Sequence, residues 1–344
     1  MAKKIIVAPL NWGLGHASRC VPIIHFLIRH KFTPIIASDG VAFVFLQKEF
    51  PTLEVLELPS YNISYAKNLK FGLLYQLPKI LKAIKLETKC IDRFVTNNED
   101  IVGVISDNRF GVRSEKVPSV YITHQIHVLS GIFTFFSSRI HQSIIKKFDE
   151  CWVPDSKENL LSGKLSKTKN KALNLNFIGA LSRFKKEELP IKNDVLIILS
   201  GIESQRERLE NRLLKAFKNT SQKVVLIQGK IEINQQKKVL GNITVYNYLL
   251  SKELERAINQ SEVIVCRSGY SSIMDLAVLK KKAFFIPTQN QSEQEYLANY
   301  LKTKKNAPFC QENNFTIAHL QELKNYNGVF CKENNLKKEL LRLF

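Results

Sequence analysis

Residues 5–20 read IIVAPLNWGLGHASRC, and this stretch decides the fold class. Residues 5–9 form a short apolar run that predicts a buried strand, and a glycine-containing loop follows over residues 10–15. In Cys20–His30 the apolar residues recur at helical spacing, so a helix is expected after the loop. A strand, a tight loop and a helix are the first unit of a doubly wound α/β sheet.

The same alternation continues through both halves of the chain. In the first half, strands are predicted at residues 33–38, 53–58, 101–106 and 119–123, and a helix at residues 43–50. In the second half, strands are predicted at residues 195–200, 223–228, 243–246, 263–266 and 283–287, with helices at residues 204–217, 254–258, 271–279 and 291–301. Strands that alternate with helices pair in parallel through right-handed crossovers, so two Rossmann-like doubly wound sheets are expected.

The chain length favours two domains, because 344 residues are too many for one ordinary core. We expect an N-terminal domain at 1–181, an exposed linker at 182–194, a C-terminal domain at 195–330 and a basic amphipathic helix at 331–344. Ligands of such folds bind where the carboxyl ends of the strands face a cleft.

The composition limits the partners. Hydrophobic residues make up 44% and charged residues 24%, the balance of a folded globular protein. No apolar run is long enough for a membrane span or a signal sequence, so a cytoplasmic protein is expected. Six scattered cysteines predict reduced thiols and no metal site. The formal charge of +20 favours an anionic partner, such as a nucleotide diphosphate or a membrane surface, although solvated lysines explain it equally well.

Loops at predicted strand ends of the first half carry side chains that can move protons. The loop after the first strand contains Gly13, Gly15, His16 and Arg19. Glycines allow close backbone approach to a ligand, a helix N-terminus favours an anion, and a histidine can act as a general base. Asp107 and His124 follow two further strands, and either could be the base or orient His16. The alternative is a tight turn with incidental polar residues.

The strongest signal of the second half is the turn Cys266-Arg267-Ser268-Gly269-Tyr270-Ser271, with Asp275 one helical turn further on. Ser268 or Ser271 can cap the helix, and the free amides of residues 268–271 predict a pocket for a diphosphate. A carboxylate at Asp275 suits a bidentate grip on two ribose hydroxyls. The alternative is a capped helix with an exposed aspartate.

A polar loop follows the next predicted strand and borders the same cleft. It contains Gln289, Gln294 and Glu295, whose side chains offer the donors and acceptors that sugar hydroxyls need. An ordinary polar loop explains most of this stretch, but Gln294 and Glu295 are the candidates for sugar contacts.

The order of these motifs resembles glycosyltransferase family 28. The motifs are Gly-x-Gly-His at 13–16, His-Gln at 124–125, Cys-Arg-Ser-Gly at 266–269 with the carboxylate of Asp275, and Pro-x-Gln with Gln-Glu over 287–295. The resemblance is specific over 263–299 and looser before residue 195. It implies the GT-B fold, with 1–181 as the acceptor-side domain and 195–330 as the nucleotide-sugar-binding domain. It also implies an inverting transfer, without a metal or other cofactor, from a UDP-sugar to a lipid-linked or saccharide acceptor. No Asp-x-Asp pair is present, in agreement with chemistry that needs no metal.

The resemblance also implies roles for single residues. Asp275 would hold the ribose, Gln294 and Glu295 the donor sugar, and the backbone near Leu249 the uracil. His16 is the first candidate for the base, followed by Asp107 and His124. The predicted donor contacts are Gly13, Gly15, Arg19, Gly201, Arg206, Leu249, Arg267, Ser268, Gly269, Tyr270, Ser271, Asp275, Gln289, Gln294 and Glu295.

The chain departs from the family pattern in three places. The loop at 200–206 has fewer glycines and gains Arg206, a candidate phosphate partner. Gln294-Glu295 stands where the family has Gln-Gln, and His124-Gln125-Ile126-His127 where it has His-Glu-Gln-Asn. These departures leave the donor sugar and the acceptor open.

Two other functions also stay open. Nucleotide-sugar hydrolases of the same fold have a stretch similar to Gly-Leu-Gly-His-x-x-Arg-Cys at 13–20, and a non-catalytic basic protein would explain the charge. No nucleic-acid-binding motif appears, so nucleic acid is not an expected partner.

Mixed apolar and basic segments at 71–86 and 128–148 include Ile132, Phe133, Phe135 and Phe136. These segments are candidates for contact with the inner face of an anionic membrane. The alternative is that their apolar residues are buried in an ordinary helix core.

Overall fold

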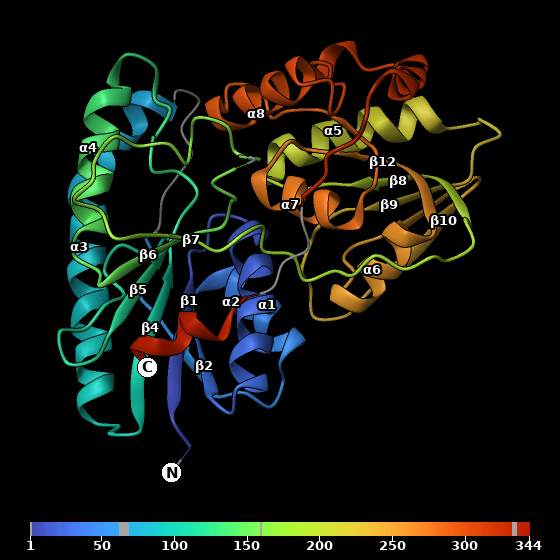
Figure 1. Ribbon diagram of the computed structural model, residues 1–344. Coiled ribbons are helices and arrows are strands. Elements are labelled where there is room, and N and C mark those ends of the chain that lie inside the picture. The colour runs from blue at the N-terminus through green and yellow to red at the C-terminus, as the bar shows by residue number, and fades with distance from the viewer. Residues whose placement is uncertain (1, 62–68, 159, 332–335) are drawn as a thin grey trace.

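A computed structural model describes residues 2–61, 69–158, 160–331 and 336–344 (Figure 1). The chain forms two parallel-sheet domains, so the predicted Rossmann-like α/β class is confirmed. The first sheet has the order β3-β2-β1-β4-β5-β6-β7, and the second has the order β10-β11-β9-β8-β12-β13. All neighbours pair in parallel except β10 and β11, which are antiparallel.

The first domain contains β1 (Lys4–Pro9), α1 (Leu14–Arg29), β2 (Thr33–Ser38), α2 (Gly40–Glu49), β3 (Val55–Glu57), α3 (Leu69–Thr96), β4 (Ile101–Asp107), β5 (Ser119–Ile122), α4 (Thr134–Ile145), β6 (Glu150–Val153) and β7 (Leu175–Phe177). The second contains β8 (Asn193–Ile198), α5 (Glu203–Phe217), β9 (Val224–Ile227), β10 (Lys237–Leu240), β11 (Ile243–Tyr246), α6 (Ser251–Asn259), β12 (Ser261–Cys266), α7 (Tyr270–Leu279), β13 (Ala283–Phe285) and α8 (Ser292–Thr303). Short 3-10 helices lie at Gly131–Phe133, Glu312–Asn314, Ile317–Asn325 and Lys338–Leu343.

Alternation along β1 explains why this strand is apolar throughout. Ile5 and Val7 pack in the core under α1, whereas Ile6 and Ala8 pack in a separate core with Ile91 of α3. A parallel strand with helices on both faces buries every side chain and therefore reads as a continuous apolar run. Figure 1 shows α1 and α2 on the side of this sheet toward the second domain, and α3 and α4 on the opposite side.

The register of the first sheet positions the chemistry-bearing loops. Pro9 at the end of β1 is paired with Asp107 at the end of β4, and Asp107 in turn with Ile122 at the end of β5. The loops that begin at these three strand ends therefore start side by side at one edge of the sheet. Parallel strands always bring their carboxyl ends together in this way.

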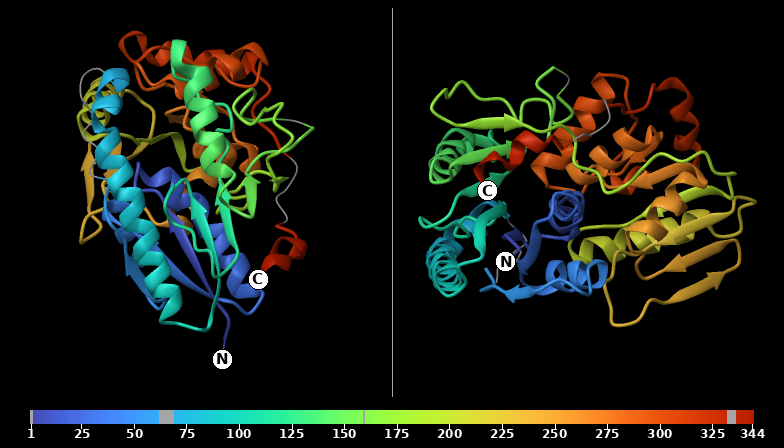
Figure 2. Two further views of the ribbon diagram at one scale, coloured as in Figure 1. Left: turned by 90° about the vertical axis from the view of Figure 1, so that its left-hand side faces the viewer. Right: turned by 60° about the horizontal axis from the view of Figure 1, so that its bottom comes forward.

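The two domains share one apolar core. Val7 and Ile24 of the first domain belong to the same buried cluster as Ile273 and Met274 of α7 and Leu254 of α6. Figure 2 shows the two domains in close contact along the side of α1 and α7. Continuous apolar burial across the junction favours the closed arrangement of the domains.

The segment between the domains is exposed over residues 185–188 and 190–192, as the sequence predicts, and differs from the predicted linker at its two ends. β8 begins at Asn193, inside the predicted linker at 182–194. Phe184 is buried, and Ser182 donates a hydrogen bond to Asp275 in α7. The first residues of the segment are thus held against the second domain, because their apolar and hydroxyl side chains find partners there.

The C-terminal tail also differs from its prediction. A basic amphipathic helix is expected, but the described part of the tail forms only the 3-10 helix Lys338–Leu343, and residues 332–335 lie outside the description. The tail returns to the first domain, where Arg342 bonds the buried Glu150 at 2.6 Å (Figure 1). Among the described residues, no helix is both long and apolar enough to cross a bilayer.

Candidate active site at the domain junction

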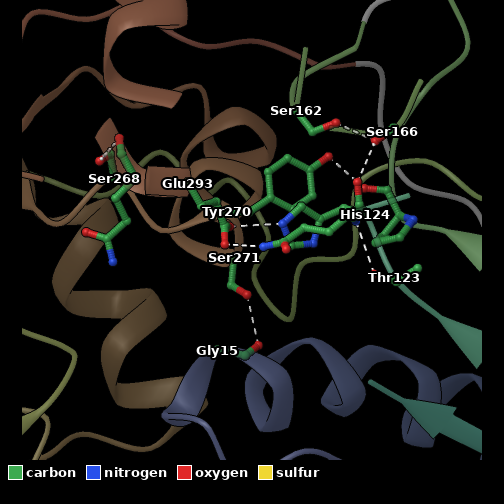
Figure 3. A network of polar contacts seen from close by, with 12 residues as sticks. Gly15, Thr123, His124, Ser162, Ser166, Ser268, Tyr270, Ser271 and Glu293 are labelled. Carbon is green, nitrogen blue, oxygen red and sulfur yellow. Dashed lines mark hydrogen bonds and ion pairs between the residues drawn. The ribbon is translucent and has the colours of Figure 1, made fainter. Parts of the chain in front are cut away.

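The candidate site lies where the N-termini of α1 and α7 meet. The Ser271 hydroxyl of α7 donates a hydrogen bond of 2.9 Å to the Gly15 carbonyl of α1 (Figure 3). Tyr270, which is 2% exposed, reaches into the first domain and donates to the Pro154 carbonyl at 2.8 Å. The partially positive ends of two helices therefore converge at one point, which is a suitable environment for an anionic group.

Asp107 is the buried centre of the first-domain half. Its carboxylate accepts two hydrogen bonds from the Arg19 guanidinium and lies 2.7 Å from Nδ1 of His16. Burial alone would raise the pKa of Asp107, but Arg19 and His16 outweigh it and hold the pKa at about 2. Asp107 is therefore a permanent anion that orients its two partners and is too weak a base to remove a proton from a hydroxyl.

His16 is the one member of this group that stays open. Its side chain is 16% exposed, and Nδ1 is fixed by Asp107. If Nδ1 carries the hydrogen for Asp107, Nε2 keeps its lone pair, and Nε2 has no hydrogen-bond partner among the described residues. Burial lowers the pKa of His16, and Arg19 lowers it further against the opposing effect of Asp107. The imidazole is thus neutral near pH 7 and able to accept a proton.

Arg19 lies beneath His16, which differs from the expected position facing a donor. It is 2% exposed, and its remaining contacts reach His16 Nδ1 at 2.9 Å and His124 Nδ1 at 3.2 Å. With Nδ1 of His16 donating to Asp107, the Arg19 donors serve the Asp107 carboxylate and Nδ1 of His124, so Arg19 links the carboxylate that holds His16 to the second imidazole.

His124 is fully engaged by its neighbours. Its Nδ1 faces Arg19, its Nε2 lies 3.0 Å from Oε1 of Glu293, and its ring stacks on Tyr270 with 4.2 Å between ring centroids (Figure 3). Both ring nitrogens are occupied, so His124 is positioned as a bridge between the domains, and His16 is the better placed base.

Glu293 is the site residue that the sequence interpretation missed. It lies in the first turn of α8, and its second carboxylate oxygen accepts a hydrogen bond from the Gln125 side chain. The residue is directly before Gln294-Glu295, but nothing in the local sequence indicates that its side chain crosses to the other domain.

The start of α7 has unpaired amides, but the predicted cap is wrong. No side chain caps this helix: the Ser268 hydroxyl donates to the Gln294 carbonyl at 2.8 Å, and Ser271 bonds Gly15. A Cβ placed on Gly13, Gly201 or Gly269 would meet nothing within 4 Å, so these three predicted loops border open space. Free first-turn amides beside open space can bind an anion directly.

Asp275 lies deeper along α7, near the segment that joins the domains. Its Oδ1 accepts a hydrogen bond of 2.6 Å from Ser182, and the positive charge of Arg183 acts on its carboxylate. Burial raises the pKa of Asp275 to about 6, although Arg183 and Ser182 partly oppose the shift. Nε and Nη1 of Arg183 are buried without a hydrogen-bond partner among the described residues.

The other predicted donor contacts differ in how far their side chains are already engaged within the protein. Gln294 accepts from the Thr288 amide and Glu295 from the Asn290 amide, both at 2.9 Å, while Gln289 is exposed. Leu249 has a buried side chain, so only its backbone can reach a ligand. Arg206 bonds the Gly229 carbonyl at 3.3 Å.

Arg267 differs from its predicted role. It is 1% exposed and donates to the carbonyls of Ile286, Pro287 and Gln205 and to Glu312. These bonds hold segments of the second domain together, because a guanidinium can serve several acceptors at once. The side chain does not face the domain junction. Within the described residues, no group of three or more His, Cys, Asp or Glu side chains is arranged to hold a metal ion.

Comparison with known proteins adds the family. Residues 195–326 match the model of the glycosyltransferase family 28 C-terminal domain. Among curated proteins, the UDP-N-acetylglucosamine–N-acetylmuramyl-(pentapeptide) pyrophosphoryl-undecaprenol N-acetylglucosamine transferase of Buchnera aphidicola subsp. Schizaphis graminum is 22% identical over 208 residues, which cover 58% of this chain and 54% of the relative. The Haemophilus ducreyi enzyme of the same name is 20% identical over 252 residues, covering 70% of this chain and 67% of the relative. The chain thus spans about half the length of the first of these relatives.

Solved structures share the whole architecture. The glycotransferase of kitacinnamycin has a TM-score of 0.62 at 12% identity and covers 94% of this chain and 90% of its own. MurG of Acinetobacter baumannii has a TM-score of 0.54 at 13% identity, with 95% and 93% covered. The protein is therefore a two-domain protein of the GT-B fold. Residues 195–326 of its second domain match the family 28 model, so the resemblance seen in the sequence is confirmed.

Proposed function

We propose that the protein is an inverting, metal-independent glycosyltransferase that moves a hexose or N-acetylhexosamine from a UDP-sugar to a lipid-linked or saccharide acceptor. One observation carries the proposal: the neutral imidazole of His16, held by the buried Asp107, directly follows Gly15, whose carbonyl bonds Ser271 at the uncapped N-terminus of α7 across the domain junction. A base on one side and an anion site on the other are the two parts that a single displacement requires.

The reaction follows from these two parts. Nε2 of His16 takes the proton of the acceptor hydroxyl as its oxygen forms a bond to the anomeric carbon. The bond between that carbon and the diphosphate oxygen breaks, and the electron pair leaves with the nucleoside diphosphate. Asp107 stabilises the imidazolium, and the first-turn amides of α7 stabilise the leaving diphosphate in place of a metal. One displacement at the anomeric carbon inverts its configuration.

The donor contacts are proposed on the same basis. Asp275 is the candidate for the ribose hydroxyls, because a carboxylate accepts two hydrogen bonds side by side. The loop at 268–271 and Gly13 would surround the diphosphate, with Arg206 as a further phosphate partner. The free amide group of Gln294 and the second oxygen of Glu295 are available for the sugar.

A membrane surface is the proposed partner on the outer face of the first domain. Figure 2 shows α3 and α4 side by side on this face. In α4, Phe135, Phe136 and Ile140 are 60%, 64% and 63% exposed, and Arg139 lies over the Phe135 ring. Phe133 is also exposed, whereas the side chains of Ile132 and residues 69–77 lie outside the description. Aromatic side chains beside cations suit the interface of an anionic bilayer, where a lipid-linked acceptor would be found.

The test is nucleotide release from a panel of UDP-sugars and other nucleotide sugars, with and without a membrane lipid extract. Wild type is compared with His16→Ala and Asp275→Ala, and His25→Ala is the control because His25 lies exposed on the same helix. We expect release that requires the extract and is lost in both site variants. Release in plain buffer would establish hydrolysis instead. No turnover and no donor binding would favour a non-catalytic basic protein.

A further inference from the structure

Glu293 is a charged second-domain side chain that reaches His124 in the proton-transfer group of the first domain. Its Oε1 lies 3.0 Å from His124 Nε2, and its Oε2 accepts from the Gln125 side chain (Figure 3). The start of α8 is itself anchored, because Gln291 caps the Gln294 amide at 2.6 Å and Ser268 bonds the Gln294 carbonyl. Glu293 is thus presented from a fixed helix end.

The protein environment stabilises Glu293 as an anion. Its side chain is 18% exposed, and burial opposes ionisation, but His124, His16 and Arg19 together hold the pKa of Glu293 below its usual range. The carboxylate therefore interacts electrostatically with the whole first-domain group and not only with the residue it touches.

The hydrogen-bond directions form a defined chain. Arg19 can only donate, so Nδ1 of His124 must accept from it, and Nε2 must carry the hydrogen that Glu293 accepts. Contacts on both sides of the ring, together with stacking on Tyr270, leave His124 one orientation. The Ser166 hydroxyl holds the His124 carbonyl at 3.2 Å, so the backbone is fixed as well (Figure 3).

Arg19 connects the fixed His124 ring to the candidate base His16. Its guanidinium touches His124 through Nη1 and Asp107 and His16 through Nη2 and Nε. A guanidinium is planar, so the position of one nitrogen determines the positions of the others. Loss of the His124 contact would leave Arg19 free to tilt away from Asp107 and His16.

We propose that Glu293 is a positioning residue that, through His124 and Arg19, aligns the His16–Asp107 pair only when the two domains are closed. This inference rests on the proposed transfer reaction. Its consequence is that the base reaches its working geometry when the second domain, which would carry the donor, is docked. An open molecule lacks the Glu293 contact and holds a less ordered base.

A different role for Glu293 predicts different kinetics. If the carboxylate instead bound a hydroxyl of the donor sugar, its removal would raise the KM for the donor. A positioning residue acts on the chemical step, so its removal lowers kcat and leaves the donor KM nearly unchanged.

The test compares Glu293→Ala, Glu293→Gln and the control Tyr300→Phe in the full chain. Tyr300 lies on the same helix and also crosses to the first domain, donating to the Leu160 carbonyl at 2.9 Å, but it does not touch His124. Glu293→Gln keeps an oxygen for Nε2 of His124 and is the conservative variant. The first readout is the ¹⁵N spectrum of the imidazoles without substrate, and the second is kcat and donor KM.

We expect Glu293→Ala to shift the Nε2 signal of His124, whose N–H loses its acceptor, and to shift the His16 signals, while Tyr300→Phe leaves both unchanged. The kcat should fall by about 10²-fold in Glu293→Ala, the loss typical of a misplaced reacting group, and recover in large part in Glu293→Gln. Unchanged His16 signals and kcat in Glu293→Ala, or a rise in donor KM alone, would overturn the inference. The spectra decide the matter even if no donor is turned over, a result that would contradict the proposed function separately.

Discussion

The two sheets share a strand order but differ at their carboxyl edges. In each, the central strands follow the same order, β3-β2-β1-β4-β5 in the first domain and β11-β9-β8-β12-β13 in the second. At the first edge, Asp107, Arg19, His16 and His124 form a buried network of charged and imidazole groups. At the second edge, the corresponding loops offer glycines, hydroxyls and uncapped backbone amides.

The difference teaches how one scaffold supplies two kinds of chemistry. Side chains fixed by a buried ion pair suit proton transfer, because their pKa values are determined by neighbours. Backbone amides at a helix start suit a diphosphate, because they bind negative charge without a side chain that could change its protonation. Four substitutions test this division.

The largest effect is expected from His16→Ala. Loss of a general base costs typically about 10²–10⁴ in rate, whereas binding of a nucleoside diphosphate should be unchanged because it belongs to the second edge. Steady-state kinetics and calorimetric titration with the diphosphate measure the two effects separately. His25→Ala is the matched control, and a large loss of diphosphate affinity in His16→Ala would contradict the division.

Asp107→Asn should affect both activity and stability. Removal of one partner of a buried ion pair costs about 3–5 kcal/mol, because Arg19 is left unpaired. Both tryptophans, Trp12 and Trp152, lie in the first domain, so their fluorescence follows the unfolding of this domain in denaturant. Asp100→Asn, which removes a partner of Lys4 at 3.1 Å near the surface, is the control and should cost less than about 1 kcal/mol.

The pH dependence of the same variant has a defined sign. The pKa of Asp107 is about 2 in the folded protein, below its usual value of 3.8. Its contribution to stability is therefore present above about pH 4 and is lost as the pH falls toward 2. Asp107→Asn should lack this part of the acid sensitivity, and an identical slope in both proteins would contradict the assignment.

Asp275→Asn should weaken donor binding by about tenfold, the value of one strong hydrogen bond to a charged group. In wild type, binding should weaken as the pH falls through about 6, because protonation removes an acceptor, and the variant should lack this dependence. The contribution of Asp275 to folding stability depends on pH with the opposite sign. Because the pKa of Asp275 is raised in the folded protein, its contribution to stability is present below about pH 3.8 and is lost as the pH rises through about 6.

Titration calorimetry with the donor across this pH range measures the binding effect. Glu262→Gln, which changes an exposed carboxylate of the same domain, is the control. Equal pH dependence in wild type and Asp275→Asn would show that another group is responsible.

The smallest effect is expected from Tyr270→Phe. The substitution leaves the Pro154 carbonyl without its cross-domain partner and should cost about 1–2 kcal/mol, measured as a lower thermal midpoint. Tyr326→Phe is the control, since no hydrogen bond of its hydroxyl is found in the described part of the chain. Equal midpoints for the two variants would show that this contact adds nothing to closure.

The strands were the most predictable part of the fold. The predicted strand 33–38 coincides with β2, because a short apolar run between turn residues has one natural interpretation. Helix starts were less predictable: α1 begins at Leu14, six positions before the predicted start at Cys20. The first turn is glycine-rich and polar, so its apolar periodicity begins only after the helix does.

Most residues of the candidate site were predicted from the sequence, but the contacts between them were not. His16, Asp107 and His124 are recognisable because each is a polar residue next to the end of an apolar strand. Arg19 is predicted as a donor contact, and only its burial and its bonds to Asp107 show that it acts within the protein instead. Glu293 could not be singled out, because it is one of several polar residues at a helix start.

The sequence by itself determined two doubly wound domains, the edge at which each places its candidate ligand-binding loops, and the family 28 motifs of the second. Tertiary structure alone decided which candidate is free to accept a proton. His16 and Asp107 are 91 positions apart, and His124 and Glu293 are 169 positions apart. The availability of a lone pair depends on such neighbours, and only folding and the closure of two domains bring them together.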